Sequence, residues 1–456
     1  MSETRSVARE VLRLTGPAVM TSFLQTLVFL TDRLMLGRFS EPALASMQVQ
    51  GAIVWSVFNV FAGLTVGTVP LIARAVGARD PERASNIARA ALRVSLVLGV
   101  LVGGLGLAFL RPLVDAIGPE SESLRELSRE YLRVIYFGFP QMFLATTAAM
   151  VMHGAGNTRT PFIIGLASNA LHVIADVVLI FGVKLGPLTL PAFGVAGAAA
   201  ASVVAFSVEA ALLLWVLRRP GAPVTVLGLF GSAGDRAADA RRALLRVSAP
   251  ALLERIAIHA GYLLYAALVS RLGALVMAGN QALLTLESIC WLSADGFGIA
   301  AAAVVGQALG RDAEKSARAA ALIAAGLAAL VLTALGLALW ATAPFTLAAF
   351  VPRGEPSAPL VSTGLRALPL LAAAQPFMAV AVVLAQSLRG AGDTRSPMLS
   401  ALAGGLLVRV GALYWLGVVR GLGLEGVWIA SGVDWVVRTL IIGVIFARGR
   451  WAKIRI

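Results

Sequence analysis

Seven carboxylates stand inside long apolar segments of this chain, and they are the side chains most able to do chemistry. A charged group in the middle of a bilayer costs about 2.5–3.5 kcal/mol on insertion scales, and it persists where it pairs, faces a water-filled cavity or serves a function. Each acid therefore needs a partner or a role. The seven are Asp32, Asp176, Glu209, Glu254, Glu287, Asp295 and Asp434.

Asp32 and Asp176 are the pair best suited to binding a proton. They lie about 20 and about 16 residues into helices expected to enter from the same side, so a rise of 1.5 Å per residue brings them to similar depths. Two carboxylates close together in a low dielectric cannot both ionise cheaply, so one of them binds a proton. Structural roles stay open: Asp32 could pair with Arg33 or Arg38, and Asp176 could cap a helix break near Gly182.

Three polar residues extend this candidate cation-coupling site. His172 precedes Asp176 by one helical turn and shares its face, and Asn169 continues that face by one more turn. Histidine is a poor Na⁺ ligand and a good proton carrier, which favours H⁺ over Na⁺. Ser202 could add a hydroxyl, although the small residues around it suit close helix packing equally well. A buried neutral histidine bonded to a carbonyl is the alternative for His172.

The carboxyl-terminal half carries its own acids. Glu287 and Asp295 are eight residues apart on a similar helix face. An anionic wall there would attract a cationic substrate, and a structural hydrogen-bond network is an equal alternative. Asp434 and Arg438 have the i, i+4 spacing of a pair on one helix, so we expect a structural ion pair. Glu254 cannot share a face with the arginine that follows it and needs a partner elsewhere.

Methionines and aromatic residues could line a cavity that accepts many ligands, because flexible sulfurs and flat rings suit varied shapes and cations. Packing against lipid or core is the alternative for most of them. We select Tyr136, Met142 and Tyr265 as candidate substrate contacts, together with Asp32, Glu287 and Asp295.

The elements that position these residues are predicted to be transmembrane helices. The chain has 456 residues, of which 58% are hydrophobic and 14% charged, whereas soluble proteins carry about 25% charged residues. Spanning a bilayer takes about 20 apolar residues. Twelve segments qualify: 12–37, 43–73, 86–110, 125–152, 160–183, 191–217, 242–270, 275–308, 316–343, 358–388, 396–419 and 424–447. The predicted fold is therefore an all-α membrane protein.

The chain is duplicated. Gly154–Arg159 returns as Gly390–Arg395, and Arg13–Ala18 returns with its proline as Arg246–Ala251. Gly194, Gly197, Ala201 and Ser202 also return, as Gly423, Gly426, Ala430 and Ser431. We expect an N-lobe (1–217), a cytoplasmic linker (218–241) and a C-lobe (242–456). Six helices per half give both halves one orientation, so their pseudo-twofold axis should follow the membrane normal.

Charge and composition restrict the remaining possibilities. Most of the 38 Lys and Arg residues fall in the termini and the even-numbered connections, which predicts cytoplasmic termini. Basic residues in short loops, and not on one soluble face, argue against nucleic-acid binding.

One cysteine, Cys290, excludes an internal disulfide, and no spacing predicts a metal site or a cleavable signal peptide. An acidic stretch, Glu120–Glu130, mixes with arginines in an expected solvated first turn.

Three motifs resemble the multidrug and toxic compound extrusion (MATE) family, in its DinF-like branch. They are Val76–Asp80, Gly298–Gly310 and Leu388–Arg395, and the likeness extends over nearly the whole chain. The resemblance implies two six-helix lobes forming a V around a central cavity. It also implies export of organic, often cationic compounds against inflow of Na⁺ or H⁺.

The resemblance also implies roles for particular residues. Asp32 falls on the family's helix 1 acid, Asp176 on the helix 5 acid of the DinF-like branch, and Glu287 on a common helix 8 acid. His172 stands where the family often has asparagine. The NorM-like branch carries a helix 10 acid at the position of Met378, so we expect cation coupling in the N-lobe alone.

We therefore expect a monomeric antiporter of the bacterial inner membrane that exports cationic, amphipathic organic compounds in exchange for H⁺. It should need no cofactor and no metal, and its environment is the lipid bilayer. A Na⁺-coupled multidrug antiporter is the first alternative. A lipid-linked glycan flippase of the related superfamily is the second, although it should carry a basic cavity and additional helices. Nothing in the motifs predicts an enzyme.

Overall fold

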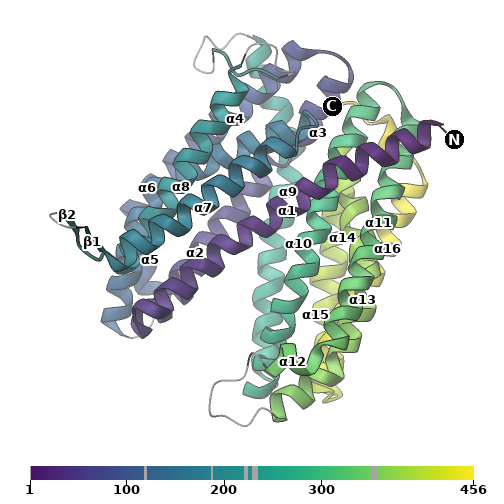
Figure 1. Ribbon diagram of the computed structural model, residues 1–456. Helices are drawn as coiled ribbons and strands as arrows, with labels where there is room; N and C mark the ends of the chain where they lie inside the picture. Colours follow the sequence, from purple (N-terminus) through teal and green to yellow (C-terminus); the bar gives the residue numbers. More distant parts are fainter. Residues whose placement is uncertain are drawn as a thin grey trace. The chain divides into compact units, whose positions relative to one another are not determined.

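A computed structural model describes residues 2–117, 121–185, 188–219, 224–228, 235–348, 350 and 358–456. Parts of the predicted linker and Glu120 of the acidic stretch lie outside them. The elements are α1 (Ser2–Phe39), α2 (Glu41–Thr65), α3 (Thr68–Gly77), α4 (Pro81–Ala108), α5 (Leu110–Ile117), α6 (Glu122–Gly154), α7 (Arg159–Phe181), β1 (Val183–Leu185), β2 (Leu188–Leu190), α8 (Gly194–Leu217), α9 (Asp235–Ser270), α10 (Ala274–Gly310), α11 (Glu314–Ala341), α12 (Ala343–Ala348), α13 (Ala358–Gly390), α14 (Arg395–Ala401), η1 (Leu402–Val408), α15 (Arg409–Leu413), η2 (Tyr414–Val419), α16 (Gly423–Ala447) and η3 (Arg450–Lys453) (Figure 1).

The helices are those of a membrane protein. In the described part, 11 helical stretches are long and apolar enough to cross a bilayer, and α1 contains the first predicted segment, 12–37. The predicted all-α membrane fold is confirmed. One small departure is the antiparallel β1–β2 hairpin between α7 and α8, in which Val183 pairs with Leu190.

The chain divides into two compact units. We call residues 20–245 the amino unit, and residues 246–456 together with 1–19 the carboxyl unit. The helix α1 is therefore shared, since its first part belongs to the carboxyl unit. These units differ from the predicted division at residues 1–19, which belong to the carboxyl unit, and at 218–245, which belong to the amino unit. The direction of the pseudo-twofold axis stays a prediction.

In the amino unit, α6 packs against α2, α3, α4 and α8. Glycines allow the close approach of α4: a Cβ on Gly99 would meet the backbone of Pro140, and one on Gly103 would meet the carbonyl oxygen of Tyr136. Aromatic side chains of α2 and α6 also pack together, and the rings of Phe61 and Phe143 stack with centroids 3.7 Å apart.

In the carboxyl unit, α13 takes the corresponding place and packs against α10, α11 and α16. Small side chains make this packing close, because a Cβ on Gly390 would meet the backbone of Ala302. Fully buried alanines of α11, including Ala317, Ala320 and Ala324, line the same core. Val11 and Leu14 of α1 pack into it as well.

The duplication is visible in the turns that connect the helices. Arg79 and Asp312 occupy equivalent positions and both have a left-handed backbone, with φ of 57° and 55°. Gly156 and Gly392 form a second such pair, with φ of 81° and 94°. The two halves therefore repeat backbone geometry as well as sequence.

The halves also differ in two places. The offset between equivalent residues falls from 236 at Gly154 to 229 at Gly194, and the β1–β2 hairpin lies in the interval where the amino half is longer. In the carboxyl half, the stretch equivalent to α7 contains two π-helical segments, η1 and η2. The prolines Pro17 and Pro250 both lie inside long helices, α1 and α9, where each removes one backbone hydrogen bond.

Candidate functional site

Three ionisable side chains meet inside the amino unit. Asp32 comes from α1, and His172 and Asp176 come from α7, where the i, i+4 spacing places both on one face. Their exposed fractions are 1%, 1% and 0%. Ser202 of α8 joins them, because a close approach of α8 to α7 follows from Gly197, whose Cβ would meet the carbonyl of Leu179. We call Asp32, His172, Asp176 and Ser202 the carboxylate–histidine cluster.

The imidazole of His172 lies between the two carboxylates. Its Nε2 atom is 3.1 Å from Oδ1 of Asp32, and its Nδ1 atom is 3.8 Å from Oδ2 of Asp176. The same Nε2 atom is also 3.1 Å from the hydroxyl oxygen of Ser202. One ligand atom from each of Asp32, His172 and Asp176 lies within 4.8 Å of the others. The structure thus brings together two carboxylates predicted to be close.

This cluster leaves polar atoms unsatisfied. Both carboxylate oxygens of Asp176 and Nδ1 of His172 are buried and lack a well-placed hydrogen-bond partner among the described residues, and Oδ1 of Asp32 lies next to Nε2 of His172, which Ser202 shares. A buried charged oxygen without a donor is costly. A proton shared among these groups, or a cation held by them, would offset that cost. The three side chains could hold one small cation, a possibility that the spacing of His and Cys in the sequence did not indicate.

The structural alternatives for the two acids do not describe what is seen. Arg33 and Arg38 are exposed, and the charged partner of Asp32 among the described residues is His172. Within the described part of the chain, Asp176 makes no hydrogen bond that would cap the end of α7 near Gly182. No arginine of that part forms an ion pair with either acid.

Two further residues differ from expectation. Asn169 is half-buried and donates through its side-chain nitrogen to the carbonyl of Gly165, 3.0 Å away, so it bonds its own helix and not the cluster. Tyr131 of α6 is 4% exposed and lies within electrostatic range of both Asp32 and Asp176. Sequence reasoning missed Tyr131, because its approach to α1 and α7 depends on tertiary packing and leaves no periodic signal.

The candidate substrate contacts of the amino unit lie in its apolar core. Tyr136 and Met142 are 2% and 3% exposed and belong to the cluster of aromatic side chains around α6. Tyr136 packs edge-on against Phe139. Their role in substrate binding stays a prediction.

The carboxyl unit contains a second cluster of ionisable groups, made of two arginines and two carboxylates. Asp434 accepts hydrogen bonds from Arg438, with distances of 2.6 and 3.1 Å, which confirms the predicted pair. Nε of Arg409 is 3.1 Å from the same carboxylate. Glu287 lies nearby, 8% exposed, with Oε1 unpartnered among the described residues. The ring of Trp435 has the guanidinium groups of both arginines within 6 Å.

The other polar candidates of this unit have structural partners. Glu254 forms a buried ion pair with Arg389, 2.6 Å long, and Asp295 accepts a hydrogen bond of 3.0 Å from Gln386. The hydroxyl of Tyr265 donates to Asn280 at 2.7 Å. Met378, at the position of the NorM-like acid, is fully buried in the apolar core.

The two clusters occupy related places in the duplicated halves. Ser202 and its equivalent Ser431 each bond a basic residue on the preceding span, His172 in one half and Arg409 in the other. The offset between those basic residues is 237, one more than between Arg159 and Arg395. The π-helix η1 lies in that interval and accommodates the extra residue. The amino unit thus has a titratable base where the carboxyl unit has a fixed cation.

Known proteins resemble this chain over its whole length. The MatE family model matches residues 17–178 and 250–415. A probable multidrug resistance protein NorM of Thermotoga maritima is 26% identical, over 99% of this chain and 94% of the relative. One of Deinococcus radiodurans is 29% identical, over 93% of this chain and 92% of the relative.

Solved structures show the same fold. A MOP superfamily transporter from Pyrococcus furiosus, described as having a binding pocket of reverse polarity, superposes with a TM-score of 0.89 at 22% identity, over 98% of this chain and 97% of that one. An outward-facing multidrug resistance MATE family transporter gives a TM-score of 0.87 at 24% identity, over 97% and 95%.

Proposed function

Because this chain belongs to the MatE family, we propose that it is a secondary antiporter that exports organic compounds in exchange for H⁺. The family predicted from the sequence is confirmed, and the chain is a multi-pass membrane protein. Its relatives are named as multidrug resistance proteins, which supports multidrug efflux as the kind of transport. They carry the name NorM, so the DinF-like branch stays a prediction.

The observation that carries the choice of H⁺ is the carboxylate–histidine cluster. Asp32, His172 and Asp176 are buried, close together and undersupplied with hydrogen-bond donors. A proton neutralises a buried carboxylate, and a single proton is enough to do so. A proton on Asp32 or Asp176 also removes one negative charge from the interior of the unit. An organic cation attracted by that charge then binds less tightly, which couples the two ligands by mutual exclusion.

The helix α1 belongs in part to each unit, so it could transmit the effect of protonating Asp32. Asp32 lies on α1, whose first part packs into the carboxyl unit and whose second part belongs to the amino unit. Pro17 removes a backbone hydrogen bond close to that division. We propose that the protonation of Asp32 biases the bend of α1 at this point, since a locally weakened helix bends at little cost.

Transport in proteoliposomes under separately imposed gradients tests the coupling ion. We expect a fluorescent organic cation to be taken up when the lumen is more acidic than the medium and no Na⁺ gradient is present. We expect no uptake when a Na⁺ gradient is imposed alone. Asp32→Asn should abolish the H⁺ response. Asp239→Asn, which removes a carboxylate that is 74% exposed, is the matched control and should transport normally. Full H⁺-driven efflux by Asp32→Asn would contradict the scheme.

Na⁺ coupling is the second candidate, because the ligand atoms of the cluster lie within 4.8 Å of one another. Two carboxylates and a serine hydroxyl are oxygen ligands of the kind that hard cations prefer. His172 at the centre of the cluster favours H⁺, since imidazole binds protons well and Na⁺ poorly. A response to the Na⁺ gradient alone would select this candidate.

The proposed substrates are cationic, amphipathic organic compounds, because the buried groups of the amino unit are acidic. We also propose that the protein lies in the bacterial inner membrane with both termini in the cytoplasm, as the distribution of Lys and Arg indicates.

A further inference from the structure

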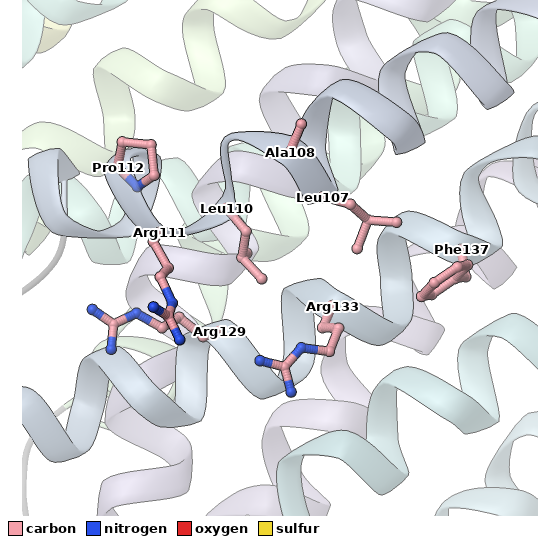
Figure 2. A pocket seen from close by; sticks show the side chains of 8 residues that line it. All are labelled: Leu107, Ala108, Leu110, Arg111, Pro112, Arg129, Arg133 and Phe137. Carbon is pink, nitrogen blue, oxygen red and sulfur yellow. The ribbon is translucent and has the colours of Figure 1, made fainter.

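A pocket with a volume of about 550 Å³ lies on the amino unit, away from the carboxylate–histidine cluster. It is formed where α4 ends and α5 begins, above the stretch of α6 from Arg129 to Phe137 (Figure 2). Its basic side is made by Arg111, Arg129 and Arg133, and its apolar side includes Leu107, Leu110 and Phe137. Figure 2 shows Arg111 extending from α5 toward the helix that carries the other two arginines.

The three arginines are not equivalent. Arg129 is held by three carboxylates, at 2.5 Å from Asp115, 2.7 Å from Glu122 and 3.0 Å from Glu126. Its charge is therefore already compensated. Arg111 and Arg133 are exposed, and neither has an ion-pair partner within residues 2–117 and 121–185. Two guanidinium groups thus remain free to bind an anion at the mouth of this pocket.

The apolar side of the pocket continues into surface that faces the bilayer. Phe137 is 65% exposed, and Leu105 and Phe109 beside the pocket are 50% and 60% exposed. The helices α4 and α6 are both candidate membrane spans. Apolar residues exposed along a span contact acyl chains, whereas arginines at the end of a span reach the phosphate layer. The pocket therefore lies at the level of lipid headgroups.

We propose that this pocket binds the headgroup of an anionic phospholipid. The phosphate is held by Arg111 and Arg133, because guanidinium groups form short, charge-assisted hydrogen bonds with phosphate oxygens. The glycerol backbone and the first acyl carbons lie against Leu107 and Phe137. Arg129 is already engaged by Asp115, Glu122 and Glu126, so the phosphate meets Arg111 and Arg133 and not Arg129.

Lipid titration of the purified full-length protein, followed by native mass spectrometry, tests the proposal. The probes are palmitoyl-oleoyl phosphatidylglycerol and the matching phosphatidylcholine. Arg111→Gln/Arg133→Gln should bind phosphatidylglycerol at least about tenfold more weakly, as expected for lost hydrogen bonds to a charged group. Binding of phosphatidylcholine should stay unchanged. The charge-preserving Arg111→Lys/Arg133→Lys variant should retain most of the affinity.

Two further variants distinguish binding in this pocket from attraction of the lipid by positive charge elsewhere on the surface. Arg271→Gln/Arg420→Gln removes two exposed arginines from connections predicted on the same side of the membrane and should bind phosphatidylglycerol like the wild type. Leu107→Trp fills the pocket without changing charge and should weaken the same lipid. A circular dichroism spectrum of each variant checks folding.

Three results would overturn the proposal. The first is wild-type binding of phosphatidylglycerol by the Arg111→Gln/Arg133→Gln variant. The second is an equal loss in the Arg271→Gln/Arg420→Gln variant, which would mean that net charge alone attracts the lipid. The third is full displacement of the lipid by millimolar inorganic phosphate, which would make the pocket a site for a free anion.

Discussion

The imidazole of His172 lies between two buried carboxylates and next to a serine hydroxyl. A histidine in this position can pass a proton between Asp32 and Asp176 because each of its nitrogens faces a different acid. An asparagine could donate a hydrogen bond there but could not carry charge. The residue type at this position therefore decides whether it can carry a proton.

Substrate binding should weaken as the pH falls. Each proton taken up by Asp32 or Asp176 removes a negative charge, and a proton on His172 adds a positive one, so all three changes repel an organic cation. Titration of a fluorescent organic cation from neutral to acidic pH measures this effect. In Asp32→Asn/Asp176→Asn the affinity should be low at every pH. A double variant that keeps the wild-type pH dependence would exclude these acids.

The buried pair of Glu254 and Arg389 should matter for stability. Their side chains are 8% and 15% exposed, so Glu254→Gln leaves a buried guanidinium without its counter-charge, which costs about 3–5 kcal/mol. Glu425→Gln breaks a pair with Arg366 whose side chains are 38% and 68% exposed, and should cost about 0–1 kcal/mol. Thermal unfolding in detergent compares the two, and equal midpoints would contradict this ranking.

At the scale of single helices, glycines of α4 determine how closely it approaches α6. Gly103→Ala places a methyl group on the carbonyl of Tyr136, and overpacking of this kind costs about 1–3 kcal/mol. Gly104 is the matched control, because nothing lies within 4 Å of its added Cβ, so Gly104→Ala should be neutral or stabilising. The apparent melting temperature in detergent measures both. Similar values for the two variants would mean that α4 can shift away.

The helices were predictable from sequence because a span needs a long apolar run, and such runs stand out in any window. Smaller features were not. The break between α2 and α3 near Gly67 interrupts the predicted span 43–73, which contains no charged residue to mark it. The π-helices η1 and η2 depend on contacts with α16, where Gly404 makes room for Asp434 and Arg438. Hydrophobic periodicity carries no information on such contacts.

The candidate site also has features that the sequence predicts and features that it does not. The depth of Asp32 and Asp176 along their helices and the i, i+4 spacing of His172 and Asp176 could be read directly. The approach of Tyr131, and the orientation of Asn169 toward its own helix, depend on how helices rotate about their axes. Two candidate contacts, Tyr136 and Met142, were chosen by residue type alone, and residue type does not separate a cavity wall from an apolar core.

At the scale of the whole chain, the duplicated halves share their turns but differ in one buried basic residue. The turns of the two halves repeat closely, yet the basic residue beside the repeated serine is His172 in one unit and Arg409 in the other. Arginine keeps its charge at any physiological pH, and Asp434 stays paired with it. The cluster of the carboxyl unit therefore keeps a fixed cation, whereas the cluster of the amino unit has a base that can gain or lose a proton.

The orientation of the whole molecule is open to a labelling test. Cys290 is fully buried, so we expect a thiol reagent to label introduced cysteines and not the native one. In right-side-out membrane vesicles, an impermeant maleimide should label Arg271→Cys. It should label Arg242→Cys, whose native side chain is 80% exposed, only after lysis. The reverse result would invert the proposed topology.

Among the described residues the β1–β2 hairpin has no counterpart in the carboxyl half, where the equivalent connection is reduced to the few residues between η2 and α16. A segment that one copy of the repeat does without is not needed to hold the helices together. It is thus the natural place to graft an epitope. An antibody fragment raised against that graft would enlarge the particle for electron microscopy while leaving every span as it is, and in the proposed orientation it would recognise the transporter on living spheroplasts.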